Sequence, residues 1–141
     1  MINIIFIIAT IIVLIYGAVI DIKIRQIPNI VPLALVILGI ARAFFLKKSI
    51  VWDLALAICA FAIILAAAVI TQQIGGGDVK LIPSVFFICG YENALIYCLS
   101  LSIILVGYSL LHKLKYKHSA KNIPLAAPIA AGYILFLFLK G

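Results

Sequence analysis

Long apolar runs alternate with short polar segments along the chain. A helix needs about 20 apolar residues to cross the hydrocarbon of a bilayer, with roughly 17 as the lower limit. Five stretches approach or exceed this length, each with at most one charged residue near an end: 4–20, 30–46, 51–70, 94–111 and 123–139. The pattern predicts a transmembrane helix in each of them.

A sixth apolar segment, 79–90, is shorter, with Lys80 at its start and Pro83 in its first turn. It either crosses the membrane or re-enters it, and the distribution of basic residues separates the two options because lysine and arginine favour the cytoplasmic side. If it crosses, the residues that share the cytoplasmic side are Lys23, Arg25, Lys80, Lys113, Lys115, Lys117 and Lys121, with Lys47, Lys48 and Lys140 outside. If it re-enters, segment 112–121 lies on the other side of the membrane from Lys23 and Arg25, and basic residues no longer favour one side.

The crossing option therefore predicts an all-α integral membrane protein, a bundle of about six transmembrane helices with both termini outside. We expect a single transmembrane domain over residues 1–141. Asn29 is expected to cap the second helix, with Pro32 in its first turn, and Pro124 and Pro128 are expected to open the last helix. The third helix is rich in alanine, which permits close helix approach, so we expect it at the centre of the bundle.

Composition agrees with a lipid environment. Hydrophobic residues make up 67% of the chain and charged residues 11%, with a mean hydropathy of +1.37. A soluble domain is about half apolar and about a quarter charged. The net charge is +7, most of the basic residues lie between the apolar runs, and no stretch of basic residues is interleaved with aromatic residues. We therefore expect the basic residues to meet lipid headgroups and not nucleic acid.

The cysteines and histidines give no sign of a metal site. Cys59, Cys89 and Cys98 lie inside apolar runs and form no C-x-x-C pair, and no histidine, cysteine and carboxylate cluster is visible in the sequence. The sequence predicts no metal and no other cofactor.

Acidic residues are scarce, because the chain has only four of them. A carboxylate at a membrane boundary is costly unless it is paired or hydrated. Asp21 ends the first apolar run and Asp78 precedes the short fourth one, so the six-helix arrangement places both on the cytoplasmic side. Two carboxylates that meet share a proton and can hold a water between a base and an acid, which is aspartyl protease chemistry. Asp53 and Glu92 fall near helix starts on the outer side, where the helix dipole favours a carboxylate.

Structural roles are open for the first pair as well. Asp21 can pair with Lys23 or Arg25, and Asp78 can cap a helix. A capping role does not explain the preceding glycines 75–77. Consecutive glycines lower the stability of a helix, so we expect them where another group must approach the backbone closely.

Two sequence motifs resemble those of a known family. Segment 75–81, GGGDVKL, resembles the GxGD motif of polytopic aspartyl proteases in the form, continued by Lys-Leu, of the type IV prepilin peptidases. Segment 21–29, DIKIRQIPN, resembles that family's first motif, an aspartate followed by a basic stretch and Ile-Pro-Asn. Segment 123–128, IPLAAP, is similar to the proline-rich opening of the family's final helix.

The resemblance implies a function and a set of site residues. Asp21 and Asp78 would be the catalytic pair of a membrane-embedded endopeptidase that removes the leader of a type IV prepilin or pilin-like precursor. The enzyme would lie in the cytoplasmic membrane of a prokaryote, with its active site facing the cytoplasm. The supporting motif residues would be Gly75, Gly76, Gly77, Lys80, Pro28 and Asn29.

One departure from the family pattern narrows the activity. Larger members carry a cytoplasmic region with paired C-x-x-C motifs and also methylate the new pilin N-terminus, whereas this chain has neither feature. The resemblance is therefore to the short, peptidase-only members, and methylation is not expected.

Two other functions fit parts of the pattern. A small transporter or proton channel also combines intramembrane carboxylates with broken helices, but its site belongs near the midplane and its halves usually resemble each other. A presenilin-like protease shares GxGD but lacks the Lys-Leu continuation and the Ile-Pro-Asn segment. The sequence leaves open whether the chain acts alone or as a homo-oligomer.

Overall fold

The structure is a computed structural model that describes residues 2–24, 26–46, 49–71, 74–115 and 125–140. Six α-helices and one short 3-10 helix account for nearly all of these residues. In chain order they are α1 (Ile2–Ile24), α2 (Ile30–Phe45), α3 (Ile50–Thr71), α4 (Gly76–Cys89), η1 (Tyr91–Asn93), α5 (Ala94–Lys115) and α6 (Ala126–Lys140). The expected all-helical membrane bundle is confirmed.

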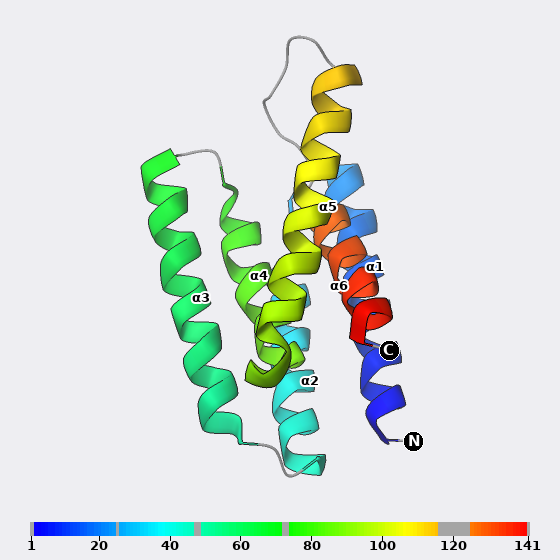
Figure 1. The fold of residues 1–141 in the computed structure, drawn as a ribbon, viewed down its shortest axis with the longest axis vertical. Helices are drawn as coiled ribbons and strands as arrows, with labels where there is room; N and C mark the ends of the chain where they lie inside the picture. The colour runs from blue at the N-terminus through cyan, green and yellow to red at the C-terminus, as the bar shows by residue number, and fades with distance from the viewer. Residues whose placement is uncertain (1, 25, 47–48, 72–73, 116–124, 141) are drawn as a thin grey trace.

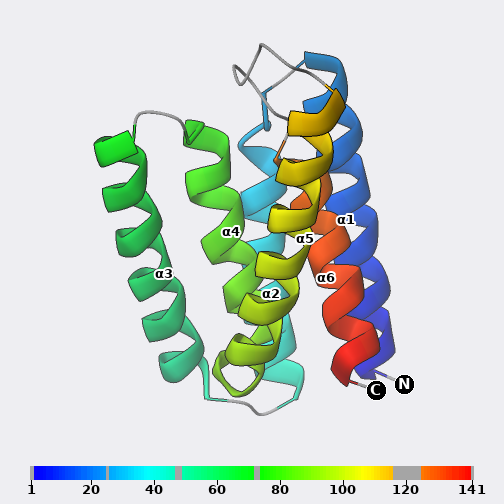
Figure 2. The same cartoon turned by 45° about the horizontal axis from the view of Figure 1, so that its top comes forward.

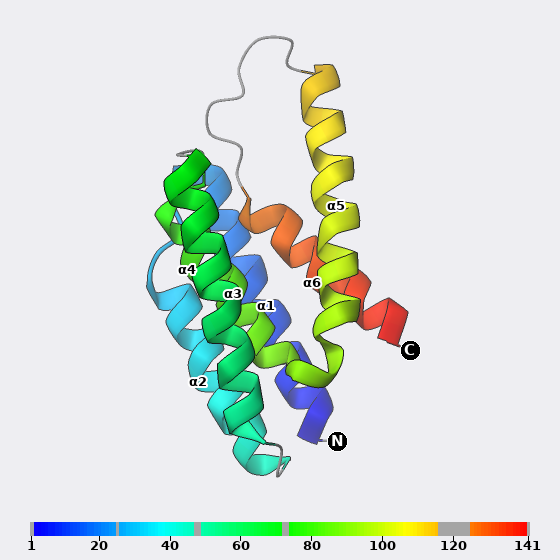
Figure 3. The ribbon, with the colours of Figure 1, turned by 60° about the vertical axis from the view of Figure 1, so that its left-hand side comes forward.

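Successive helices run in opposite directions (Figure 1). The ends of α1, α3 and α5 and the starts of α2, α4 and α6 point toward the same end of the bundle, which we call the upper end (Figures 1 and 2). The starts of α1, α3 and α5 and the ends of α2, α4 and α6 form the lower end. The first and last described residues also lie toward this end (Figure 3). Helix α4 therefore runs between the two ends and does not double back.

The helices differ in length. The segments long and apolar enough to cross a membrane unaided are Asn3–Ile24, Ile50–Ile70 and Tyr91–Leu111. Helices α2 and α6 are shorter but apolar. Helix α4 has 14 residues and extends about 21 Å, less than the hydrocarbon thickness of roughly 30 Å. A helix this short is tolerated because the surrounding protein covers most of it.

Helix α4 is at the centre of the bundle, and α3 is at its edge. Most α4 residues are buried, and its main packing partners are α2 and α3. Phe87 of α4 fits against Gly39 of α2, where an added Cβ would lie 2.5 Å from the ring. By contrast, only 6% of the apolar window of α3 is buried.

The expectation that the alanine-rich third helix forms the centre is therefore wrong. Lipid tails are as apolar as alanine, so small residues permit helix packing without requiring it. Helix α4 carries Asp78, Ser84 and Pro83, and polar side chains and interrupted backbone bonds must be enclosed by protein within a membrane.

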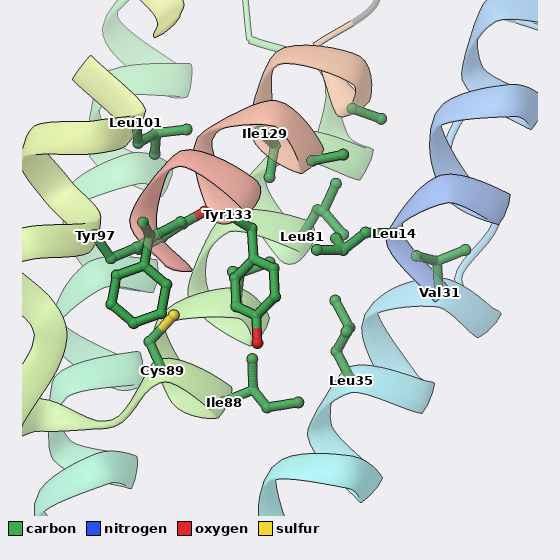
Figure 4. Packing of buried hydrophobic residues seen from close by; sticks show 14 residues of the cluster. Leu14, Val31, Leu35, Leu81, Ile88, Cys89, Tyr97, Leu101, Ile129 and Tyr133 are labelled. Carbon is green, nitrogen blue, oxygen red and sulfur yellow. The ribbon is translucent and has the colours of Figure 1, made fainter. Parts of the chain in front are cut away.

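The apolar core joins the remaining helices around α4. Leu81 faces Leu14 of α1 on one side of the cluster in Figure 4, with Val31 and Leu35 of α2 nearby. On the other side, fully buried Tyr97 packs edge-on against Phe86 at 4.9 Å and against Phe136 of α6 at 6.0 Å between ring centroids. These aromatic contacts join α5 to α4 and to α6.

The helix starts follow the sequence only in part. Pro32 and Pro128 each occupy the third position of their helix, as expected. Pro124 lies outside the described residues. Asn29 stands at the N-cap position of α2, as expected, but its side chain makes no capping hydrogen bond. Its side-chain oxygen instead accepts a hydrogen bond from Lys80 of α4.

Candidate active site

The upper end of the bundle brings together the last two turns of α1 and the first turn of α4. Asp21 comes from α1 and is 5% exposed, and Asp78 comes from α4 and is 8% exposed. The two carboxylates are near enough for their negative charges to repel each other. Two residues separated by more than fifty positions in the chain thus share one buried environment.

Two contacts hold the start of α4 against the connection between α1 and α2. Gly77 lies so near Ile27 that a Cβ added to the glycine would be 2.8 Å from the Cβ of Ile27. One turn further along α4, Lys80 Nζ donates a hydrogen bond to Asn29 Oδ1 at 3.1 Å. Because Asp78 lies between Gly77 and Lys80, these contacts fix where its carboxylate sits relative to α1.

Helix α6 contributes a hydrogen-bond donor to Asp21. The backbone N–H of Ala126, the first residue of α6, donates to Asp21 Oδ2 at 3.0 Å. The first N–H groups of a helix have no partner within the helix, and the positive end of its dipole favours an anion. The alternative in which Lys23 pairs with Asp21 is not seen, and Arg25 lies outside the described residues.

Asp78 occupies the third position of α4 and is not its cap. Gly75 takes the N-cap position, with an extended backbone, and its carbonyl accepts the N–H of Asp78 at 3.0 Å. A Cβ added to Gly75 would lie 3.1 Å from Asp78 Oδ2. The other oxygen, Oδ1, is buried without a hydrogen-bond partner among the described residues. Gly75 therefore takes the cap position, and the Asp78 carboxylate accepts a hydrogen bond from the Gly75 backbone N–H at the start of the helix.

The geometry has a clear chemical consequence. Each of two carboxylates in a buried site disfavours the charge of the other, so such a site favours the state in which the pair shares one proton. A pair in that state holds a general base and a general acid side by side. One oxygen of Asp21 accepts from Ala126, whereas Asp78 Oδ1 has no hydrogen-bond partner among the described residues.

The other two acidic residues lie at the lower end. Asp53 is in the first turn of α3, as expected, but it is buried and accepts the N–H of Tyr91 at 2.8 Å. Glu92 lies in η1, ahead of α5. Neither residue is part of the site at the upper end.

A polar cluster at the lower end was not expected from the sequence. Arg42, buried in α2, donates to the carbonyl of Ile88, the residue before the end of α4. Gly90 follows with a φ of +80°, and a Cβ there would lie 3.0 Å from Asp53 Oδ1 and 3.4 Å from Arg42 Nη1. The signal that could have revealed this cluster is an arginine inside an apolar run, because such a charge needs a polar partner.

No metal-binding cluster occurs within the part of the chain that the structure describes, since no three histidine, cysteine or carboxylate side chains come together there. Cys89 is buried within the apolar core, and Cys59 and Cys98 are exposed on the helix surfaces. The candidate active site thus consists of carboxylates, backbone groups and the Lys80–Asn29 contact.

Comparison with known proteins gives one family. The model of the type IV leader peptidase family matches residues 8–111. The match includes both aspartates and both motifs, and it ends before α6. Comparisons with curated proteins and with solved structures gave no match.

Proposed function

This chain belongs to the type IV leader peptidase family, and from that premise we propose that Asp21 and Asp78 form the catalytic pair of an aspartyl endopeptidase. The observation that carries the proposal is the juxtaposition of two buried, mutually repelling carboxylates at one end of a membrane bundle. The remaining acidic residues, Asp53 and Glu92, lie at the other end and have no part in the proposed chemistry.

The proposed reaction is hydrolysis of a peptide bond by a pair that shares one proton. The ionised carboxylate takes a proton from a water while the water oxygen bonds to the scissile carbonyl carbon, and the protonated carboxyl gives its proton to the carbonyl oxygen. The resulting diol returns a proton to the ionised member as the C–N bond breaks. The other member protonates the leaving amine, so the pair ends with one proton, as it began.

The proposed substrate is a type IV prepilin or pilin-like precursor, with a basic leader ahead of an apolar segment. The family supports a leader peptidase, and the position of the aspartates at a helix end suits a bond near the membrane surface. No methylation is proposed, because the chain lacks the paired C-x-x-C motifs of the larger members.

The active site is proposed to face the cytoplasm. Basic residues at the upper end support this orientation through the positive-inside rule. Within the described helices, the lysines near that end are Lys23, Lys80, Lys113 and Lys115. At the lower end, Lys140 closes α6, and Arg42 is buried near Asp53.

A transporter or proton channel is a weaker reading. A transport site belongs near the midplane, whereas Asp21 and Asp78 both lie within two turns of a helix end. The match to a peptidase family also favours hydrolysis over transport. The same match favours the leader peptidases over presenilin-like proteases.

The purified protein in detergent micelles is expected to cleave a synthetic precursor that carries a basic leader followed by about 20 apolar residues. Cleavage at a single bond near the leader boundary, measured by mass spectrometry, would support the assignment. Activity should persist in EDTA, because the proposed mechanism uses carboxylates alone. Loss of activity that returns on adding zinc would point to a metalloprotease instead.

Cysteine labelling should report the orientation. In a variant without the natural cysteines, a single cysteine at Gln26 is expected to be shielded from an impermeant reagent added outside intact cells. Single cysteines at Ser49 and Glu92 should react, because the starts of α3 and η1 lie at the lower end. Shielding of Glu92 together with Gln26 would contradict the crossing of α4.

A further inference from the structure

Two hollows lie in series between α3 and α4. One, of about 270 Å³, is lined by Val36, Leu54, Ala57, Ile58, Phe61, Lys80, Pro83, Ser84 and Phe87. The other, of about 320 Å³, is lined by Phe61, Leu65, Ala68, Val69, Ile74, Gly76, Val79 and Lys80. Phe61 and Lys80 border both, so the two hollows are neighbours along α3 and α4, and we call them together the α3–α4 groove.

The upper part of the groove lies beside the turn of α4 that carries the candidate catalytic carboxylate, and Asp78 itself lines neither hollow. Gly76 and Val79, which line its upper part, lie two residues before and one residue after Asp78. At the other extreme, Leu54 belongs to the first turns of α3. The groove therefore extends from the active-site end of the bundle through much of the depth of α3.

The walls of the groove are suited to an apolar chain of some bulk. Ala57 and Ala68 of α3 leave space opposite α4, and most other lining groups are hydrocarbon. Each hollow is close to the lower end of the roughly 300–1,000 Å³ typical of sites for small ligands. The volume is sufficient for a few large side chains along one face of an inserted segment.

The backbone of α4 offers a polar contact that an acyl chain could not use. Pro83 has no N–H, so the carbonyl of Val79 loses the donor that any other residue at position 83 would supply. Val79 itself lines the groove beside Asp78. A polypeptide beside α4 has backbone N–H groups that can satisfy such a carbonyl, whereas a lipid tail has none, and this difference favours a peptide over lipid at this part of the helix.

We propose that the α3–α4 groove is the subsite that binds the apolar segment of the precursor next to the scissile bond. This inference rests on the proposed peptidase function, because it identifies where that substrate would lie. The polypeptide runs along α4 with its cleavage site at the Asp78 end, and α3 forms the outer wall. Residues Ala57, Phe61 and Ala68 then determine which apolar side chains fit.

Photocrosslinking tests the location of the substrate directly. A benzophenone side chain is placed at Phe61, within the groove, or at Ile63, on α3 outside it, in the Asp78→Asn background. A labelled synthetic precursor with a basic leader and about 20 apolar residues is the probe. We expect crosslinking at position 61 that excess unlabelled precursor abolishes, and little at position 63.

The outcomes separate the groove from the peptidase proposal. Cleavage by the unsubstituted protein, with crosslinking absent at position 61 or equal at both positions, would refute the groove. Crosslinking at 61 only to lipid would refute it too. Specific crosslinking to the precursor without any cleavage would refute the peptidase function and leave the groove as a binding site.

Kinetics supply a second test in the unsubstituted active-site background. Ala57→Leu and Ala68→Leu narrow the groove and are expected to raise KM for the precursor about tenfold with little change in kcat, because overfilling a packed site opposes binding. Ala66→Leu is the matched control, since Ala66 is exposed on α3 outside the groove. Equal KM values for all three variants would contradict the subsite.

Discussion

Asp21→Asn and Asp78→Asn are each expected to abolish precursor cleavage, with a loss of at least about a hundredfold in kcat. General acid-base help is worth roughly a hundred- to ten-thousandfold, and a pair that shares one proton fails when either member can no longer titrate. Asparagine keeps the shape of aspartate and its hydrogen-bond oxygen, so the contact of position 21 with Ala126 can persist. Cleavage is measured in purified protein that elutes as a normally folded species.

The controls lie at the lower end of the bundle. Glu92→Gln is expected to leave cleavage largely intact, and Asp53→Asn should as well because its amide oxygen can still accept the N–H of Tyr91. Wild-type cleavage by a well-folded Asp78→Asn protein would overturn the catalytic assignment. That result is the one expected if Asp78 had only a structural role, because asparagine can replace aspartate at a helix start with little loss.

Gly77→Ala should lower kcat about a hundredfold, while Gly76→Ala, whose effect through the groove would fall on KM, should keep a kcat close to that of the unsubstituted protein. A Cβ at position 77 would meet the Cβ of Ile27 at 2.8 Å, so the first turn of α4 must move away from the α1–α2 connection and carry Asp78 with it. A displacement of about 1 Å at a catalytic group can cost about a hundredfold in rate. At position 76, an added Cβ meets nothing within 4 Å.

The two alanine variants form a matched pair, because they make the same chemical change one residue apart in the same helix turn. Both should insert and fold, which thermal unfolding followed by size-exclusion chromatography can verify. Unimpaired kcat in both Gly76→Ala and Gly77→Ala would show that the contact with Ile27 does not position Asp78. An equal loss in both would instead indicate a general requirement for backbone freedom in the GGGD segment.

The helices could be predicted from sequence because lipid imposes a simple rule on the backbone. Every N–H and C=O in the hydrocarbon must be paired locally, so long apolar runs become helices almost regardless of their detail. The run 51–70, for example, lies within α3 at Ile50–Thr71. The short segment beginning at Val79 was harder to place. The distribution of basic residues favoured a crossing helix, and α4 runs from one end of the bundle to the other, in agreement with that prediction.

The arrangement of those helices could not be predicted in the same way. In lipid, an apolar face carries no preference for the centre of a bundle, so the alanines of α3 gave a wrong indication. Polar side chains and the interrupted backbone at proline were the better guide, since Asp78, Ser84 and Pro83 all lie on the central helix α4. The preference for enclosed polar groups, more than small size, determined which helix is surrounded.

The candidate site was partly visible in the sequence. Acidic residues are scarce, which drew attention to Asp21 and Asp78, and the number of membrane crossings between them predicted that both lie on the same side of the membrane. The donor from Ala126 was not foreseeable, because a backbone N–H carries no sequence signal and belongs to a helix more than a hundred residues away. Asn29 misled for a related reason, since the same side chain can cap its own helix or accept from Lys80.

The lower polar cluster has a consequence for genetic screens. Arg42, Gly90 and Asp53 join α2, α3 and α4 at the end opposite the aspartates, so replacing them should shorten the lifetime of the protein in the cell without altering the chemistry of surviving molecules. Replacements at Asp21 or Asp78 should leave abundant, inert protein. Inactive alleles from random mutagenesis would then fall into two groups by immunoblot, and each group would map to one end of the bundle.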